Sequence, residues 1–314
     1  MAIAHVEGLA FVRFTVPDLE AMLAFATDFG LKLAHRTEDT LYFRGTSSAP
    51  YLHVASLGEP GFAGLAFVAS AKEVAALAQF EGVPVEPLAG PAGGIVVRLT
   101  DPDGFRVEVV ADLSPAIPLE VPPRAPLNDA LDHERRGRIP KRLGSGPAHV
   151  VRLGHCVLSV SDFRRSESWY KSRFGFVTSD EIVDKDGVFG EANLPVGSFL
   201  RCDRGATLTD HHTLFLLATG SPGFHHAAFE VLDFDDLMAG HNHLKAQSRM
   251  QEWGVGRHLL GSQIFDYWRD PWGHTVEHWT DGDVFDASWG SHSASVQEAL
   301  AIQWGPEFPK GVKP

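Results

Sequence analysis

The sequence has few features of a secreted, membrane-spanning or nucleic-acid-binding protein. It contains only two cysteines, Cys156 and Cys202, and their spacing is not the C-x-x-C type of redox and metal sites. A reducing compartment is therefore the better expectation, with a disulfide between the two left open. The start, MAIAHVEGLAF, has no basic stretch before an apolar run, and no segment approaches the roughly 18 apolar residues that a membrane helix needs. We expect a cytoplasmic protein with no membrane partner.

Basic charge is also scarce. The chain has 27 Lys and Arg against 40 Asp and Glu, a formal net charge of -13. This balance disfavours nucleic acid and anionic membrane surfaces, because their phosphates attract basic surfaces. Apolar residues, by contrast, make up 44% of the 314 residues, which is enough to fill the cores of two ordinary domains.

The two halves of the chain repeat one another. Residues 8–33 and 152–177 both have the pattern of a strand, an Asp-containing turn and an amphipathic helix, and Asp18 matches Asp162. Two later pairs of segments also match: FAGLAFVAS with FHHAAFEVL, and DPDGFRVEVVAD with DPWGHTVEHWTD. Each half contains two units, with helices expected over 19–29, 72–79, 163–174 and 234–247. The repeat therefore predicts four modules of the order strand, helix and three strands.

The domain organisation follows from where the repeat stops. Residues 113–149 are rich in proline, which is unfavourable in helices and in central strands, so we expect a linker there. This assigns residues 1–112 to an N-terminal domain and residues 150–281 to a C-terminal domain. Residues 282–314 depart from the repeat, and we expect this tail to cover a pocket or to join subunits.

The first half lacks histidines at the positions where the second half has them. On the shared register, the first half has Phe11, Gly64 and Glu108 where the second has His155, His226 and Glu277. Two imidazoles and one carboxylate are a common ligand set for ferrous iron in oxygen-activating enzymes, and they leave coordination positions free. We therefore predict one metal site, wholly in the second half, and expect Glu108 to form salt bridges or hydrogen bonds instead.

Two consecutive histidines compete for one ligand position. Side chains of adjacent strand residues face opposite sides of a sheet, so His225 and His226 cannot both point at the metal. The repeat register favours His226 and leaves His225 as a residue with a structural role.

Four motifs of the second half resemble a known family. They are GHCVLSVSD around His155, DHHTLF from Asp210, FHHAAFEV from Phe224, and G-R-H-x8-Y-x2-D-P-x-G-x3-E from Gly256 to Glu277. The set resembles the type I extradiol ring-cleaving dioxygenases of the vicinal oxygen chelate superfamily, and through the four repeats the resemblance covers nearly the whole chain. It implies an α+β fold of four βαβββ modules, paired into two domains that are each an open, incomplete β-barrel with outer helices. It also implies that His155, His226 and Glu277 bind Fe(II), although Mn(II) suits the same ligands.

The resemblance also implies roles for further residues. His212 is similar to the acid-base residue beside the dioxygen site, with His211 as its rival; both histidines are expected near the pocket. His258 and Tyr267 match the pair that hydrogen-bonds the catechol oxygens. The implied partners are a catecholic substrate and O2, and the family leads us to expect a homo-oligomer.

The expected reaction is insertion of both atoms of O2 into a substituted catechol or a trihydroxybenzene such as trihydroxytoluene, in the degradation of aromatic compounds. Some family members that cleave carboxylate-bearing catechols have an arginine shortly before G-R-H, where this chain has Trp253, which we expect in the substrate pocket. Because an indole cannot pair with a carboxylate, we expect a neutral substituent. Two alternatives stay open: a glyoxalase-like metal-dependent lyase or isomerase, and a metal-free protein of the same fold that binds small molecules.

Overall fold

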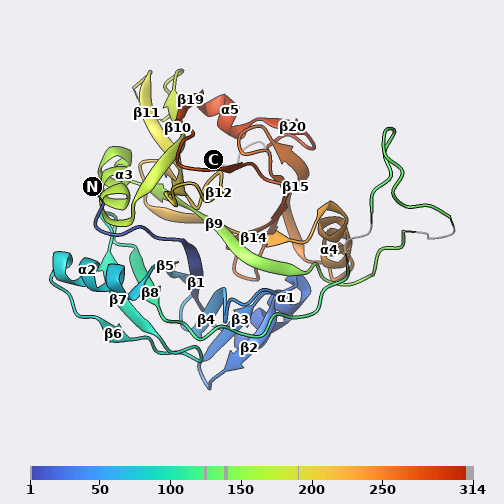
Figure 1. Cartoon of the computed structure of the whole chain (residues 1–314), viewed down its shortest axis with the longest axis horizontal. Helices are drawn as coiled ribbons and strands as arrows, with labels where there is room; N and C mark the ends of the chain where they lie inside the picture. Colours follow the sequence, from blue (N-terminus) through green and yellow to red (C-terminus); the bar gives the residue numbers. More distant parts are fainter. Residues whose placement is uncertain (1, 124–125, 138–140, 190, 309–314) are drawn as a thin grey trace.

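The computed structural model describes residues 2–123, 126–137, 141–189 and 191–308. Two large sheets dominate it, one from each half of the chain, in the lower and upper parts of Figure 1. The first sheet has the order β2-β3-β4-β1-β5-β8-β7-β6. Its strands are β1 (Gly8–Val16), β2 (Lys32–Arg36), β3 (Thr40–Arg44), β4 (His53–Leu57), β5 (Gly61–Val68), β6 (Glu86–Pro87), β7 (Ile95–Thr100) and β8 (Arg106–Ala111).

The second sheet has the order β19-β10-β11-β13-β9-β14-β17-β16-β15-β20. Its strands are β9 (Val150–Val160), β10 (Phe176–Asp184), β11 (Leu194–Cys202), β13 (Leu214–Ala218), β14 (Gly223–Val231), β15 (Met250–His258), β16 (Ile264–Arg269), β17 (Thr275–Thr280), β19 (His292–Ser295) and β20 (Ile302–Trp304). A separate short ribbon joins β12 (Thr209–Asp210) to β18 (Val284–Phe285). Among the described residues, the edge strands of each sheet do not pair with each other, so both sheets are open.

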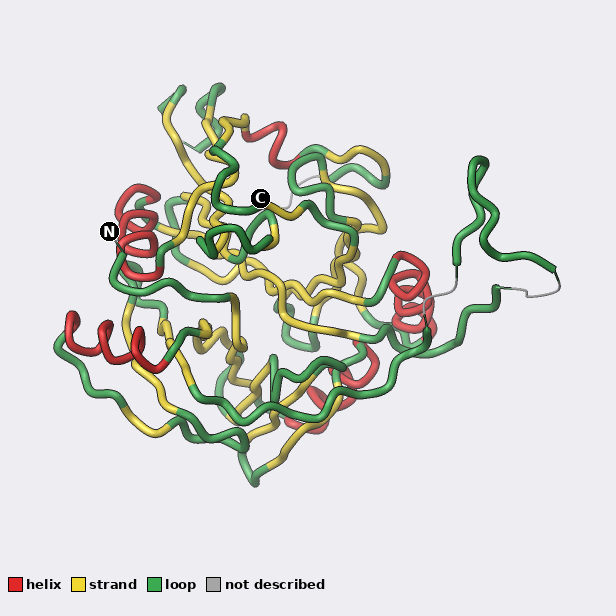
Figure 2. Tube along the Cα trace, in the orientation of Figure 1, coloured by secondary structure: helices red, strands yellow, loops and turns green. Residues whose placement is uncertain are grey.

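The helices are α1 (Leu19–Phe29), α2 (Ala71–Glu81), α3 (Phe163–Phe174), α4 (Phe234–Ala246) and the short α5 (Val296–Leu300). Figure 2 shows how few they are beside the strands. This is the expected α+β arrangement of open sheets with a few helices. None of the described helices is long and apolar enough to cross a lipid bilayer.

The structure confirms the internal repeat in detail. Asp18 and Asp162 both cap a helix N-terminus, with φ and ψ of -140° and 107° in one case and -139° and 106° in the other. The strand register also repeats: Arg13 lies opposite Gly64 in the first sheet, and Val157 lies opposite His226 in the second. Gly64 and His226 are therefore structural counterparts, as the sequence predicted.

The two halves share one apolar core. Phe224 of β14 stacks on Phe62 of β5 with ring centroids 4.6 Å apart and meets Phe14 of β1 at 5.1 Å. Arg249 reaches across the same boundary and donates to the Asp28 carboxylate at 2.6 and 2.8 Å. Burial of large aromatic rings on both sides holds the second sheet against the first.

The segment between the sheets has little regular structure. The described part of residues 113–149 contains one isolated bridge, between Asn128 and His133, and otherwise runs as an extended loop (Figure 1). The two cysteines lie in the second half and are both buried and free, so they do not form a disulfide with each other.

In the first half, an aromatic side chain and a cluster of salt bridges occupy the positions that correspond to the candidate metal ligands. Phe11 is fully buried against Tyr51, with ring centroids 5.0 Å apart. Glu108, only 1% exposed, accepts from Arg13 at 2.7 Å, from Arg98 at 3.1 Å and from Arg106. The expectation that Glu108 forms salt bridges is confirmed.

We expect Glu108→Ala to destabilise the protein by about 2 kcal/mol, because it removes hydrogen bonds between charged groups and leaves the arginines without their buried partner. The measurement is the urea midpoint, with Glu86→Ala as the control, since Glu86 is a half-exposed carboxylate that pairs with Arg98. Equal midpoints for the two variants would contradict the role assigned to Glu108.

Candidate metal centre and active site

Three neighbouring strands of the second sheet bring the predicted ligands together. His155 lies on β9, His226 on β14 and Glu277 on β17, and all three side chains are buried. The Nε2 atoms of the two histidines are 3.3 Å apart, and Oε2 of Glu277 lies 3.2 Å from one and 3.3 Å from the other. Residues 122 positions apart in the chain thus form one compact cluster.

The donor set fits a divalent metal ion. Ligands that bind one ion at roughly 2.1 Å in neighbouring octahedral positions lie about 3 Å from each other, close to the observed separations. Two imidazole nitrogens face each other here beside a carboxylate, and Oε1 of Glu277 is buried without a hydrogen-bond partner among the described residues. Hydrogen bonds alone leave this cluster incompletely satisfied, whereas a cation at its centre accepts electron pairs from all three groups.

Charge in the cluster also favours a cation. Burial alone would raise the pKa of Glu277, but hydrogen bonds with His155 and His226 hold it below its ordinary value. Burial lowers the pKa of His155, which favours the neutral imidazole that binds metals. An ionised carboxylate and a neutral imidazole are the ligand forms that a metal requires.

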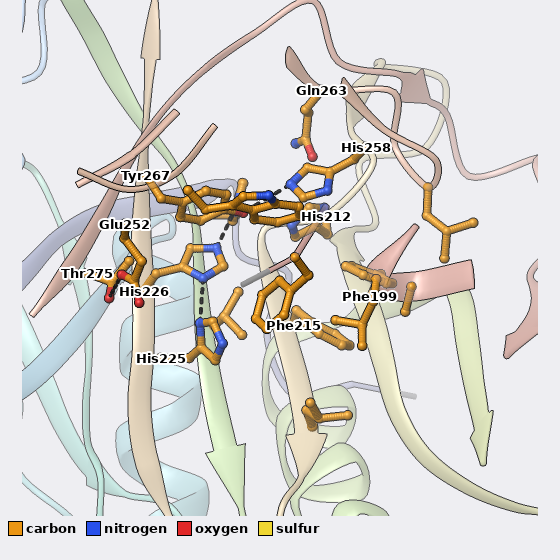
Figure 3. A pocket seen from close by; sticks show the side chains of 18 of the residues that line it. Phe199, His212, Phe215, His225, His226, Glu252, His258, Gln263, Tyr267 and Thr275 are labelled. Carbon is orange, nitrogen blue, oxygen red and sulfur yellow. Dashed lines mark hydrogen bonds between the residues drawn. The ribbon is translucent and has the colours of Figure 1, made fainter. Parts of the chain in front are cut away.

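His225 corrects one prediction from strand alternation. We expected it to face away from the metal, but it lines the same cavity as His226, and the two Nδ1 atoms are 2.8 Å apart (Figure 3). The reason is a register shift between Phe224 and His226 in the pairing of β14 with β9, since a bulge interrupts the alternation of side chains. If Nε2 of His226 binds a metal, its Nδ1 carries the proton and donates it to Nδ1 of His225.

This contact predicts that His225 raises metal affinity. His225→Phe keeps an aromatic ring but has no acceptor, and we expect it to weaken metal binding about 10- to 100-fold, the usual effect of losing a hydrogen bond to a metal-bound histidine. His225→Gln, which keeps an acceptor oxygen, is the matched control. Metal titration of the apoprotein measures both, and equal affinities for the two variants would refute the role.

His212 and His211 take different positions. His212 lines the cavity, and its ring centroid lies 4.0 Å from that of His155. Burial, followed by the neighbouring His155 and His211, lowers the pKa of His212 well below its ordinary value. His211, also expected at the pocket, is not among the lining residues, because its ring lies behind His212 and its Nε2 bonds to the Asp180 carboxylate at 2.6 Å.

His258 and Tyr267 meet above the metal cluster. Nε2 of His258 lies 3.1 Å from the Tyr267 hydroxyl, and the Trp253 ring stacks on Tyr267 with centroids 5.5 Å apart. Burial lowers the pKa of His258 to about 4. Burial, and then the Glu277 carboxylate, raises the pKa of Tyr267 well above its ordinary value. Both side chains are therefore neutral and can exchange hydrogen bonds with a ligand.

The cavity that joins these residues has a volume of about 250 Å³ and mostly apolar walls (Figure 3). The sequence did not predict much of this lining, which comes from β11, β13, α5 and the chain after β20: Phe199, Phe215, Leu217, Ala299, Leu300 and Phe308. No arginine or lysine is among the described lining residues, and Glu252 is there with its carboxylate bound to Arg269 and Thr275. The spacing of these apolar residues offered no clue, since they resemble ordinary core positions.

Comparisons with known proteins identify a matching family model and similar proteins. Residues 152–278 match the model of the Glyoxalase/Bleomycin resistance protein/Dioxygenase superfamily. Metapyrocatechase 2 of Cupriavidus necator is 29% identical over 97% of this chain and 91% of its own. The 3-methylcatechol 2,3-dioxygenase of Pseudomonas putida is 25% identical over 96% of this chain and 98% of its own.

Solved structures show the same fold. The Mn(II)-bound glyoxalase of Novosphingobium aromaticivorans superposes with a TM-score of 0.78 at 24% identity, covering 99% of this chain and 95% of its own. The substrate complex of homoprotocatechuate 2,3-dioxygenase from Brevibacterium fuscum has a TM-score of 0.76 at 19% identity, covering 98% and 92%. Residues 152–278 thus resemble a superfamily of glyoxalases, bleomycin resistance proteins and dioxygenases, and the whole chain has the same fold as these two solved structures.

Proposed function

We propose that this protein is an extradiol dioxygenase that cleaves a catecholic ring beside its two hydroxyl groups and incorporates both atoms of O2. The observation that carries the proposal is the convergence of two imidazoles and one carboxylate beside an apolar cavity, which His155 and His226 line together with His212, His258 and Tyr267. The names of the two full-length relatives, a metapyrocatechase and a methylcatechol dioxygenase, support it.

We assign Fe(II) as the metal, with Mn(II) as the alternative that the same ligands accept. His155, His226 and Glu277 would hold this metal, which would supply a Lewis acid for the diol and a path for electrons from the diol to dioxygen. A third relative, an iron-dependent extradiol dioxygenase of Rhodococcus jostii, supports iron; it is 28% identical over 52% of this chain.

The surrounding residues would bind and orient the substrate. His258 and Tyr267, already hydrogen-bonded to each other, would bind the diol oxygens and favour the ionised phenol. His212, whose ring packs on His155, would accept and return a proton. The apolar side chains would exclude water and thereby strengthen these hydrogen bonds.

The test is to load the apoprotein anaerobically with ferrous iron, add a panel of diols and then admit air. We expect oxygen uptake and a yellow ring-fission product with iron, and a comparison with manganese identifies the metal. Bound iron without product from any diol would instead favour the glyoxalase-like lyase or isomerase. Failure to bind a metal at all would favour a metal-free binding protein.

The cavity also predicts substrate selectivity. We expect neutral alkyl- or aryl-substituted catechols to exceed carboxylated ones in kcat/KM by more than about tenfold, because no arginine or lysine among the described lining residues can pair with a carboxylate substituent and replace its water. Trp253→Arg should narrow that ratio, and Trp253→Phe is the control. A carboxylated catechol that proves the better substrate of the wild-type protein would contradict the prediction.

A further inference from the structure

A series of three hydrogen-bonded side chains leads from the cavity towards solvent. Nδ1 of His212 lies 3.1 Å from Nδ1 of His211, and Nε2 of His211 lies 2.6 Å from Oδ2 of Asp180. Asp180 lies on β10, outside every motif that the sequence singled out. Its other carboxylate oxygen lies 4.0 Å from Nδ1 of His292, whose side chain is 79% exposed.

Hydrogen bonds and ring contacts fix the position of His211 in this series of side chains. Its backbone N–H donates to the carbonyl of Asp283 at 2.9 Å, and its carbonyl accepts from the Ser179 hydroxyl at 2.6 Å. Arg201, itself buried, donates to that hydroxyl at 3.0 Å. Phe199 and Phe285 lie against the ring.

A bulge in β10 allows Ser179 and Asp180 to contact the same histidine. Ser179 and Asp180 are adjacent and both contact His211, although neighbours in a regular strand face opposite ways. The β10–β11 register shifts between Thr178 and Asp180, and this bulge lets both side chains reach the same histidine.

Hydrogen-bond polarity then links Asp180 to the cavity. A carboxylate only accepts, so Nε2 of His211 carries a proton. If His211 is neutral, its Nδ1 accepts from His212, whose Nε2 then has a free lone pair and acts as a base. If His211 carries a second proton, its Nδ1 donates to His212, whose Nε2 then carries the proton and acts as an acid.

We propose that Asp180 and His211 are positioning residues that store a proton for His212 and set which tautomer His212 presents to the substrate. This inference rests on the proposed function. Transfer of the Nε2 proton of His212 to a reacting oxygen, with the Nδ1 proton of His211 moving to Nδ1 of His212, leaves both imidazoles neutral. The reverse transfer takes up a substrate proton, and Asp180 compensates the charge on His211 meanwhile.

The kinetic test is Asp180→Asn, which keeps the size of the side chain and removes its charge. We expect kcat to fall about 10- to 100-fold, part of what a positioned acid-base group contributes, with KM and metal content within twofold of wild type. Asp180→Glu should recover part of the loss. The matched control is Glu181→Gln, a change on the same strand at a carboxylate that pairs with Arg164.

A double variant distinguishes loss of proton transfer through Asp180 and His211 from a loss of activity caused by altered packing. His211→Gln should lower kcat by a similar factor, and Asp180→Asn combined with His211→Gln should lose no more than the worse single variant, because both act through one chain. Additive losses, or a loss of metal in step with activity, would overturn the proposal, as would a kcat for Asp180→Asn within twofold of wild type.

A measurement that does not require catalytic turnover tests this proposal separately from the proposed function. In protein labelled with ¹⁵N-histidine and loaded with diamagnetic zinc, we expect Asp180→Asn to move the ring nitrogen shifts of both His211 and His212, while Glu181→Gln leaves them in place. Unchanged shifts would refute the relay. A wild-type protein that binds iron but cleaves no diol would refute the proposed function, and the nitrogen shifts would still decide the tautomers.

Discussion

Glu277→Gln should lose tightly bound metal and at least about a thousandfold in ring-cleavage rate. A metal supplies several kcal/mol of transition-state stabilisation, and each 1.36 kcal/mol corresponds to a factor of ten. The amide is nearly isosteric with the carboxylate, but it is neutral and places an NH2 group within the ligand cluster, where Oε2 lies 3.2 Å from His155. Metal content after dialysis and the rate of O2 uptake measure the effect.

The repeat provides the control for this experiment. Glu108 is the counterpart of Glu277 in the first half, since Ala66 lies opposite Glu108 as Ala228 lies opposite Glu277. Glu108→Gln should lower stability and leave metal content unchanged. If Glu108→Gln released metal as Glu277→Gln does, the assignment of one site to the second half would be wrong.

His212→Ala is expected to lower kcat by about 10²- to 10⁴-fold, the range for loss of a positioned acid-base group. Diol binding should change much less, because His258 and Tyr267 would bind the substrate oxygens and are untouched. Anaerobic diol titration and steady-state O2 uptake separate the two effects.

His211→Ala tests the rival assignment. It should lower kcat less than His212→Ala does, because His211 lies behind His212 and does not line the cavity. Normal turnover by the His212→Ala protein, together with an inactive His211→Ala protein, would reverse the assignment.

The sequence was most informative where the repeat could be compared with itself. The alignment of Phe11, Gly64 and Glu108 with the three candidate ligands predicted one metal site, in the second half of the chain and not in the first. The helix bounds 19–29 and 163–174 match those in the structure, because an aspartate cap and a following glycine mark each end locally.

Local periodicity could not predict interactions that depend on a break in register. Strand alternation placed His225 on the wrong face, and a bulge beside it brings it into the cavity. Asp180 had no distinguishing pattern, and it meets His211 only because another bulge redirects β10.

The sequence by itself thus determined the fold class, the repeat and the three candidate ligands, since those follow from hydrophobic period and from residues compared at equivalent positions. The tertiary structure alone decided the walls of the cavity, including Ala299, Leu300 and Phe308 of the tail, the hydrogen bond of His225 and the chain from His212 to Asp180. Those contacts join residues far apart in the chain, and their geometry depends on how curved, bulged strands pack, which no short stretch of sequence specifies.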